Sequence, residues 1–461
     1  MKKILCVLMT VCLLACTFVF PASAATAEPT DTFVPVMRFV ACSDTHVSDN
    51  NDMTTIRIGK MMAKAYEIAG EDPNYTAVDA LLIAGDLTND GTATEFRKFW
   101  NAVDGALQDG TQFLGIVAKN HDGWDMGRKE YRNLFTELSG CDADFHVVIG
   151  GYHFIGLSAS PNDAMHYDLS QLTWLKKQLD AATAEDPTKP VFVTHHEHVR
   201  GTVYGSSFYD GWGVPYFKSI LDGYPQVVDL SGHSHYPLND PRSVWQEKFT
   251  AIGTGAIYYS EFTIDEIRAY DPPDCYETGT CWIIELDADH NMRLRGLDVD
   301  EGRFLCDFIM ENPADPENRS FTKEARKAVA AAPAFAEGAL ISVQPFYGGC
   351  NIVAPVAESV DGMPVVLYRA YAMNVREVKL TESWTLPQYY RAIDLDEIEL
   401  TLNDLGEGDY IIRVVAENAY GMQSEPLDAR VKIDGTSKYL SVFTYLKQLF
   451  NRIAYFLKEL F

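Results

Sequence analysis

Histidine and acidic side chains recur in five short motifs along the first half of the chain. In order these are Asp44-Thr45-His46, Gly85-Asp86, Asn120-His121-Asp122, His195-His196 and Gly232-His233-Ser234-His235. Carboxylate, amide and imidazole groups bind hard or borderline divalent metals, whereas the cysteine ligands of structural zinc sites are absent from all five motifs. The chain has only 11 histidines, and packing alone does not require them in such motifs. Together the motifs predict metal-dependent chemistry.

Each motif lies at the end of a predicted strand. The strands are expected at residues 37–41, 80–84, 113–118, 190–194 and 227–230. Read singly, each motif could be an ordinary polar turn or a helix cap. Open α/β folds, however, gather the carboxyl ends of their strands at one rim, where their sites lie. A shared carboxylate there can hold two ions roughly 3.5–4 Å apart, an arrangement used for phosphoryl transfer.

The ordered set of motifs resembles the calcineurin-like metallophosphoesterase family, over roughly residues 36–300. The resemblance implies two divalent ions, manganese, iron or zinc, held by residues of all five motifs. It assigns one ion to Asp44, His46 and His235, and the other to Asn120, His195 and His233, with Asp86 bridging the two.

The same resemblance implies a hydrolase of phosphate monoesters or diesters. In its two-metal mechanism a metal-bound hydroxide, formed because the ions lower the pKa of water to about 7, attacks the phosphorus. His121 would act as general acid on the leaving oxygen, and Asp122 would orient His121. The runner-up hypothesis is a cell-surface binding or adhesion protein whose metal site is catalytically silent.

Two positions depart from the family pattern, and one is ambiguous. Lys119 stands where the family usually has glycine before the Asn-His pair, so this loop could take a different path. Asn89 stands where purple acid phosphatases have a tyrosine ligand, so an iron-tyrosinate site is not expected. The family pattern favours His195 over His196 as the ligand, which leaves His196 a supporting or structural role.

Four basic residues beside the motifs are candidate substrate-binding groups. They are Lys119, His198, Arg200 and Arg242. Each could bind a further phosphate or the leaving group, although a basic residue in a loop is more often simply solvated. The loop of residues 201–215, rich in tyrosine, glycine and tryptophan, is expected to line the substrate pocket.

The elements around the motifs predict an α/β fold followed by an all-β module. Short apolar runs alternate with helical patterns over residues 31–325, which predicts a layered sandwich of mixed β-sheets flanked by helices. An Ala-rich linker is expected at residues 326–339. Residues 340–434 resemble a fibronectin type III domain, an immunoglobulin-like sandwich, mainly through the stretch 410–426. Its implied role is spacing or docking, because a fold alone supplies no chemistry.

The two ends of the chain carry different signals. Residues 1–24 combine a basic start, an apolar run and small residues, which predicts a secretory signal peptide cut after Ala24. An uncleaved anchor and a lipoprotein signal at Cys16 are the alternatives. Residues 435–461 predict a basic amphipathic helix, which could contact a membrane surface or cell envelope, or could pack on the protein. We therefore expect a secreted or cell-envelope bacterial protein.

The net charge limits the classes of ligand that the protein is expected to bind, and the cysteines allow one short disulfide. The net charge of −27 repels phosphate backbones, so binding to a nucleic-acid duplex is not expected. The expected partner is a small phosphate ester. Cys275 and Cys281 flank a short loop that a disulfide could close, although two free thiols fit the sequence equally well.

Overall fold

The computed structural model describes residues 33–162, 167–207, 214, 216–265 and 267–434. The described residues from Pro35 to Asp434 belong to one compact unit. The expected signal peptide and the amphipathic helix of residues 435–461 lie outside the described residues and stay predictions. Among the described residues, none of the helices has the length and apolar character that a membrane crossing requires.

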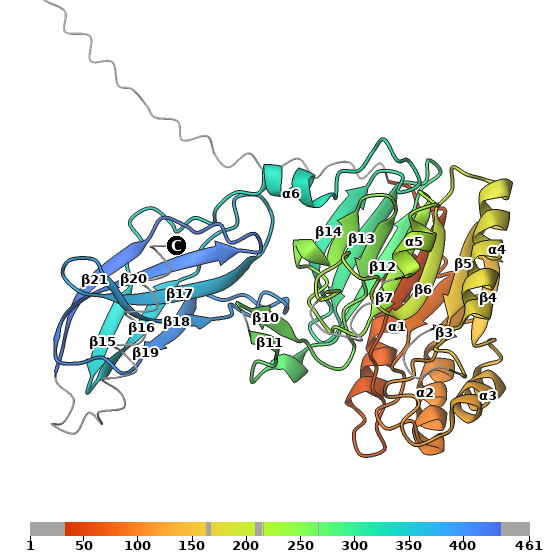
Figure 1. Ribbon diagram of the computed structural model, residues 1–461, viewed down its shortest axis with the longest axis horizontal. Coiled ribbons are helices and arrows are strands. Elements are labelled where there is room, and N and C mark those ends of the chain that lie inside the picture. Colours follow the sequence, from red (N-terminus) through yellow and green to blue (C-terminus); the bar gives the residue numbers. More distant parts are fainter. Residues whose placement is uncertain (1–32, 163–166, 208–213, 215, 266, 435–461) are drawn as a thin grey trace, which may run out of the picture. The chain divides into compact units, whose positions relative to one another are not determined.

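The first sheet is six-stranded and mixed. Its order is β14 (Arg303–Met310), β13 (Met292–Asp298), β12 (Thr280–Leu286), β1 (Met37–Cys42), β2 (Ala80–Ala84) and β3 (Gln112–Ile116). Helices α1 (Met53–Glu71), α2 (Ala93–Ala106) and α3 (Arg128–Ser139) cover one face (Figure 1). Met61, Phe99 and Phe135 from these helices pack with Val40 and Ile83 of the sheet. The spacing of such apolar residues along each helix places them on the buried side.

The second sheet is also six-stranded and mixed. Its order is β4 (Asp144–Ile149), β5 (Tyr152–Leu157), β6 (Val191–Glu197), β7 (Val227–Gly232), β9 (Thr250–Gly253) and β8 (Val244–Gln246). Helices α4 (Leu169–Glu185) and α5 (Phe217–Leu221) cover its outer face, where Leu175 and Phe217 pack against Val193. Helix α4 starts cleanly because the Asp168 carboxylate accepts a hydrogen bond from the backbone of Gln171.

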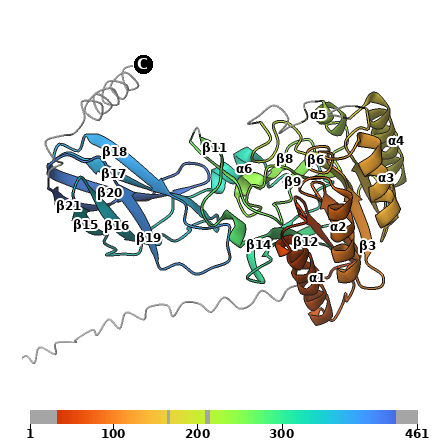
Figure 2. The ribbon, with the colours of Figure 1, turned by 90° about the horizontal axis from the view of Figure 1, so that it is seen from below.

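The two sheets pack face to face and form the central core. The rings of Phe39, Phe154 and Phe192 meet there with centroids 4.9–5.3 Å apart. Trp282 of the first sheet is fully buried and donates its indole N–H to the carbonyl of Gly253 in the second. The arrangement is a four-layer α/β/β/α sandwich, seen from a second side in Figure 2. The predicted layered α/β fold is confirmed.

The parallel strands of both sheets set the position of the site. β1, β2 and β3 run parallel in one sheet, as do β5, β6, β7 and β9 in the other. The loops after β1 and β2 are joined by backbone hydrogen bonds, from Asp44 N–H to Gly85 O and from His46 N–H to Asp86 O, both 3.0 Å long. Loops that carry different motifs are therefore held together at one rim.

The C-terminal part is an all-β sandwich, as expected. One sheet contains β15 (Ser342–Phe346), β16 (Gly349–Pro355) and β19 (Glu397–Leu402); the other contains β18 (Lys379–Thr385), β17 (Val365–Met373), β20 (Gly408–Asn418) and β21 (Leu427–Ile433). Ile352, Tyr368 and Ile412 belong to their shared core. The short helix α6 (Lys323–Val329) precedes this part, and the rest of the predicted linker is non-helical. The exact domain boundaries stay a prediction.

A hairpin of β10 (Phe262–Ile264) and β11 (Ile267–Tyr270) packs against the β-sandwich. Phe262 and Ile264 share a small apolar cluster with Leu367 and Tyr390. The guanidinium of Arg369 donates to both oxygens of Asp265, at 2.6 and 2.9 Å. These contacts connect the β-sandwich to the hairpin of β10 and β11.

The two cysteines that could have formed a disulfide are not bonded to each other. In the structure Cys275 and Cys281 are both free thiols.

Candidate active site

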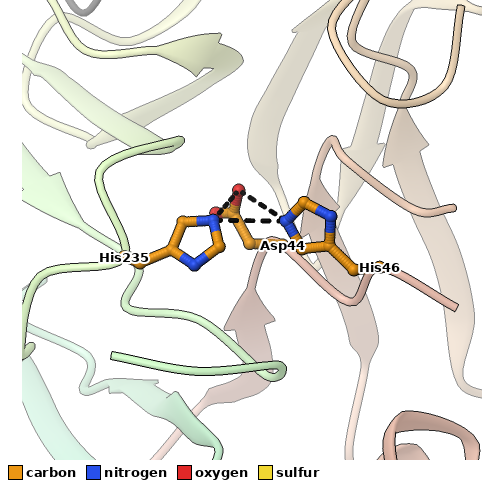
Figure 3. A group of neighbouring side chains, drawn as sticks. All are labelled: Asp44, His46 and His235. Carbon is orange, nitrogen blue, oxygen red and sulfur yellow. Dashed lines mark hydrogen bonds and ion pairs between the residues drawn. The ribbon is translucent and has the colours of Figure 1, made fainter. Parts of the chain in front are cut away.

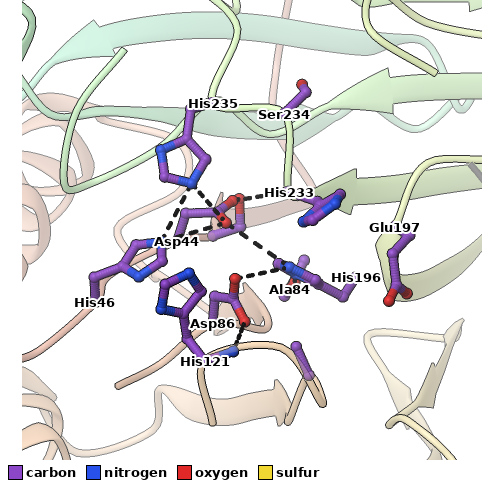
Figure 4. Close-up of polar contacts among 12 residues, drawn as sticks. Asp44, His46, Ala84, Asp86, His121, His196, Glu197, His233, Ser234 and His235 are labelled. Atoms are coloured by element: carbon purple, nitrogen blue, oxygen red, sulfur yellow. Dashed lines mark hydrogen bonds and ion pairs between the residues drawn. The ribbon is translucent and has the colours of Figure 1, made fainter. Parts of the chain in front are cut away.

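Seven acidic and histidine side chains meet at the rim where the parallel strands end. They fall into three overlapping groups whose ligand atoms lie within 4.8 Å of one another. We call this set the Asp/His cluster: Asp44, His46, Asp86, His121, His196, His233 and His235. Figure 4 shows these side chains converging from the ends of both sheets.

In the first group, Asp44, His46 and His235 point at a common centre (Figure 3). His235 Nε2 lies 3.1 Å from Asp44 Oδ1 and 3.2 Å from His46 Nε2. Burial lowers the pKa of His46 to about 4, so its ring is neutral and has a lone pair to offer. Burial acts the same way on His235, but the carboxylate of Asp44 outweighs it and raises the pKa of His235. The carboxylate thus favours a positive charge at this centre.

The second group joins Asp86, His196 and His233. His196 Nε2 lies 3.1 Å from Asp86 Oδ2. The other ring nitrogen, Nδ1, faces the backbone carbonyl of Ala84 at 2.8 Å. A carbonyl can only accept, so Nδ1 carries a hydrogen, and Nε2 is the ring atom that faces Asp86. Backbone support of this kind is typical of metal-ligating histidines. Burial lowers the pKa of His233 to about 3, which keeps its ring neutral too.

Backbone strain concentrates in the Asp/His cluster. Five of its residues, all but His121 and His196, have left-handed φ values between 41° and 74°. Such conformations are costly for non-glycine residues and tend to occur at functional sites. Asp44 Oδ1 and His196 Nε2 are buried, and each faces another ligand group of the cluster at 3.1 Å. The strain and the convergence of ligand atoms both fit a cation at this place.

The prediction that His195 is a metal ligand is wrong, because the structure places His196 in the cluster instead. His195 is fully buried on the other face of β6, where its ring packs 4.4 Å from that of Phe217. Its Nε2 lies 2.8 Å from Asp229 Oδ1. Successive residues of a strand point to opposite faces. Phe192 faces the core between the sheets and Val193 faces the helices, so His196 shares the face of Phe192.

The predicted contact between Asp122 and His121 is also absent from the described structure. Both Asp122 oxygens hold the backbone: one accepts from the N–H and hydroxyl of Thr88, and the other from the N–H of Ala118. Burial and the nearby Asp86 raise the pKa of Asp122 to about 7. The imidazole of His121 is instead held by Asn89, whose carbonyl lies 2.8 Å from His121 Nδ1. Asp122 therefore shapes the loops, and Asn89 orients the ring.

The other predicted residues divide by accessibility. Asn120 and Lys119 are half-buried on the loop that carries His121. His198 is buried, and its two ring nitrogens contact the hydroxyls of Ser231 and Ser234 at 2.9 and 2.8 Å. This pairing makes the expected substrate role of His198 wrong.

The two arginines predicted to bind substrate have different surroundings. Arg242 forms two hydrogen bonds to Asp240, at 2.6 and 2.8 Å, and stacks over the ring of Tyr204. A guanidinium engaged on both sides is poorly placed to bind substrate, so this expectation is not supported. Arg200 is half-buried, and its backbone N–H bonds to Val214. Residues 208–213 and 215 of the predicted pocket loop lie outside the described residues.

Sequence reasoning missed four aromatic residues beside the cluster. The ring of Tyr259 lies 4.2 Å from that of His235, and Tyr258 lies 5.5 Å from His46. Tyr276 packs against both tyrosines, and Trp124 lies 4.1 Å from His121. The tyrosines belong to the segment between β9 and β12, outside all five motifs. Only the unusual density of tyrosine there could have drawn attention to them.

Comparison with known proteins identifies the first domain. Residues 37–237 match the model of the calcineurin-like phosphoesterase family. They belong to this family. The matched stretch contains every residue of the Asp/His cluster. Because the family consists of phosphoesterases, the expected enzyme class, a hydrolase of phosphoric ester bonds, is confirmed. No match was found among curated protein sequences.

Solved structures show only distant similarity. GAP50, the anchor in the inner membrane complex of Plasmodium, is 13% identical with a TM-score of 0.41, covering 60% of this chain and 89% of that one. The purple acid phosphatase PPD1 from yellow lupin seeds has the same identity and TM-score, and covers 60% of this chain and 53% of its own. A human fibronectin type III domain is 15% identical with a TM-score of 0.15, covering 24% of this chain and 95% of the domain. The family assignment therefore depends on the match to residues 37–237.

Proposed function

We propose that the protein is a secreted, metal-dependent phosphoesterase that hydrolyses a small phosphate monoester or diester. One observation carries the proposal: carboxylate and imidazole ligand atoms converge at one rim, and within each group they lie within 4.8 Å of one another. A cation would be held by these atoms. The five strained residues at this rim are typical of a functional site.

The cluster has the donors for two divalent ions. Asp44, His46 and His235 would hold one ion, and Asp86, His196 and His233 would hold the other. The carboxylate of Asp86 would reach both, since it also lies in the group that contains His46 and His121. Asn120, half-buried next to His121, would add an amide oxygen. Bound ions would offset the charge of the phosphoryl oxygens and make a water molecule acidic enough to react near neutral pH.

His121 would transfer the proton to the leaving oxygen. Its Nδ1 donates to the carbonyl of Asn89, so its Nε2 is the ring atom left to exchange a proton. The ring lies 4.3 Å from that of His46, at the edge of the cluster. The backbone N–H of His121 also donates to Asp86 Oδ1, at 3.2 Å. This hydrogen bond would fix the position of His121 relative to the carboxylate of Asp86.

The finer parts of the proposal rest on the sequence. Secretion is supported by the pattern of residues 1–24, and contact with a membrane surface or cell envelope by the basic amphipathic pattern of residues 435–461. Manganese, iron and zinc all suit a donor set of carboxylate, amide and imidazole groups.

The test uses the mature chain from Ala25 to Phe461. The protein is stripped of metal, reloaded with manganese, zinc or iron, and assayed on p-nitrophenyl phosphate and bis-p-nitrophenyl phosphate. We expect metal-dependent turnover that Asp86→Ala and His121→Ala both reduce strongly. His290→Gln is the matched control, because His290 follows β12 near the amino-terminal end of β1, at the opposite rim. A folded, metal-loaded protein that turns over neither ester would contradict the proposal.

A further inference from the structure

Three tyrosine rings form a compact group at the edge of the Asp/His cluster. Tyr258 and Tyr259 follow each other in the chain, and Tyr276 packs 5.2 and 5.1 Å from them. Because the three rings contact one another, a ligand would lie on the group rather than inside it. We call Tyr258, Tyr259 and Tyr276 the aromatic platform. It adjoins the first metal group, since Tyr259 lies 4.2 Å from His235.

The outer ring of this platform is unusually exposed. Tyr276 is 45% exposed, and Trp124, beside His121, is 58% exposed. Exposed aromatic residues beside a candidate catalytic site indicate a ligand surface rather than a core. A substrate whose phosphoryl group lies at the cluster would extend its leaving group over one of these rings.

A carboxylate gives the platform a negative character. The hydroxyl of Tyr259 donates to Glu261 Oε1 at 2.9 Å, and Glu261 Oε2 is buried without a hydrogen-bond partner among the described residues. A positive charge would therefore be stabilised beside the platform. An anionic leaving group would be repelled.

The platform is held rigidly from behind. Arg57, only 2% exposed, donates to the backbone carbonyls of Tyr258 and Tyr276 at 2.7 and 2.6 Å. Its own charge is balanced by Asp300, 2.6 Å away. The backbone that carries Tyr258 and Tyr276 is therefore held in place before any ligand arrives, which lowers the entropy cost of binding.

We propose that the aromatic platform and Glu261 bind the ammonium end of an amino-alcohol, so that the preferred substrates are phosphate esters of choline-like or ethanolamine-like alcohols. This specificity rests on the proposed function of the Asp/His cluster. Tyrosine faces attract alkylammonium ions within about 6 Å of the ring centre, and the carboxylate of Glu261 strengthens that attraction. A neutral planar leaving group would gain from the rings but nothing from Glu261.

The test compares two substrates that differ only in charge. Choline phosphate has a quaternary nitrogen where 3,3-dimethylbutyl phosphate has a carbon. Each is used as the monoester and as the p-nitrophenyl diester, with the metal-loaded full chain. We expect the kcat/KM for the choline ester to exceed that for the neutral ester by about tenfold, a size typical of a cation on aromatic rings with charge support. Tyr276→Leu and Glu261→Gln should each reduce this ratio to about threefold or less.

Tyr347→Leu is the matched control, because Tyr347 is a 58% exposed tyrosine in the β-sandwich; it should leave the ratio unchanged. A wild-type ratio near one, or a ratio that neither platform variant changes, would overturn the proposal. A preference for the neutral ester would assign the platform to apolar leaving groups instead. If no ester were turned over, the proposed function would fail. Calorimetric binding of choline phosphate and its neutral analogue would then still decide whether the platform recognises the charge.

Discussion

Replacing each of two adjacent histidines should separate catalysis from stability. His196 Nε2 lies 3.1 Å from Asp86 and faces the cluster, whereas His195 Nε2 lies 2.8 Å from Asp229 and faces the helices. Loss of a residue that merely supports a metal ligand typically costs 10–100-fold in metal affinity or activity. His196→Ala removes a ligand itself, so we expect kcat/KM to fall by at least about 100-fold. Metal content should drop from about two ions per chain to about one.

The same change at His195 should act on folding instead. His195 and Asp229 are both fully buried, so His195→Leu leaves a buried carboxylate without its partner. Breaking a buried pair in this way costs about 3–5 kcal/mol. His195→Gln keeps a hydrogen-bond donor for Asp229 and should lose less stability, while its kcat/KM stays within about tenfold of wild type, less than the loss of a ligand would cause.

The assay combines metal analysis by mass spectrometry, urea unfolding and kinetics on p-nitrophenyl esters for the three variants. A His195→Gln protein that remains folded but loses one ion and its activity would refute the assignment of His196. A His196→Ala protein that bound two ions and turned over substrate normally would also refute the assignment of His196 as a metal ligand.

Four further predictions follow from individual contacts. Asp168→Ala should destabilise the protein by about 1 kcal/mol in urea unfolding, whereas Asp168→Asn, which keeps a capping oxygen but not the charge, should lose less. Hydrogen bonds from Ser170 and Gln171 lower the pKa of Asp168 from 3.8 to about 2. The stabilisation by its charge is therefore complete above pH 3.8 and is lost as the pH falls through 2, so the difference between wild type and Asp168→Ala should shrink there. Arg369→Leu removes both hydrogen bonds to Asp265 and should cost about 1–3 kcal/mol in the same assay; an unchanged unfolding midpoint would show that the hairpin and the sandwich are not coupled. Arg57→Met should reduce the preference for choline over the neutral ester, because it frees the carbonyls that fix the aromatic platform; loss of activity on both esters alike would argue against a positioning role. Manganese at roughly 100 times its dissociation constant should stabilise the wild-type protein by about 2.7 kcal/mol, seen as a higher melting temperature, whereas chelation should remove that gain.

The fold could be predicted where apolar runs were continuous. β2 has the bounds expected from sequence, because the strand is buried on both faces and reads as an unbroken apolar run. β4 and β14 were missed because their exposed and buried residues do not alternate cleanly. Helix α3 was missed as well: it has polar residues through most of its length and begins at a glycine without a side-chain cap.

The site could be predicted as a set of motifs but not as a geometry. Choosing between His195 and His196 requires knowing which face of β6 looks toward the other sheet. Since Phe192 and Val193 are both apolar and both buried, alternation alone does not reveal the face. The role of Asp122 was also predicted wrongly. Its carboxylate binds the backbone N–H groups of Thr88 and Ala118, and a sequence pattern does not show which backbone groups lie near a side chain.

The strained residues explain why this site needs loops from both sheets. A left-handed residue at Asp44 or Asp86 is costly, and it persists only where surrounding structure fixes it. Here the N–H of Asp44 bonds to Gly85 and that of His46 to Asp86, so each strained loop supports the other. The second sheet contributes the N–H of His233, which donates to Asp44 Oδ2 at 2.9 Å. The alignment of the carboxylates and imidazoles is thus a product of packing the two parallel rims together.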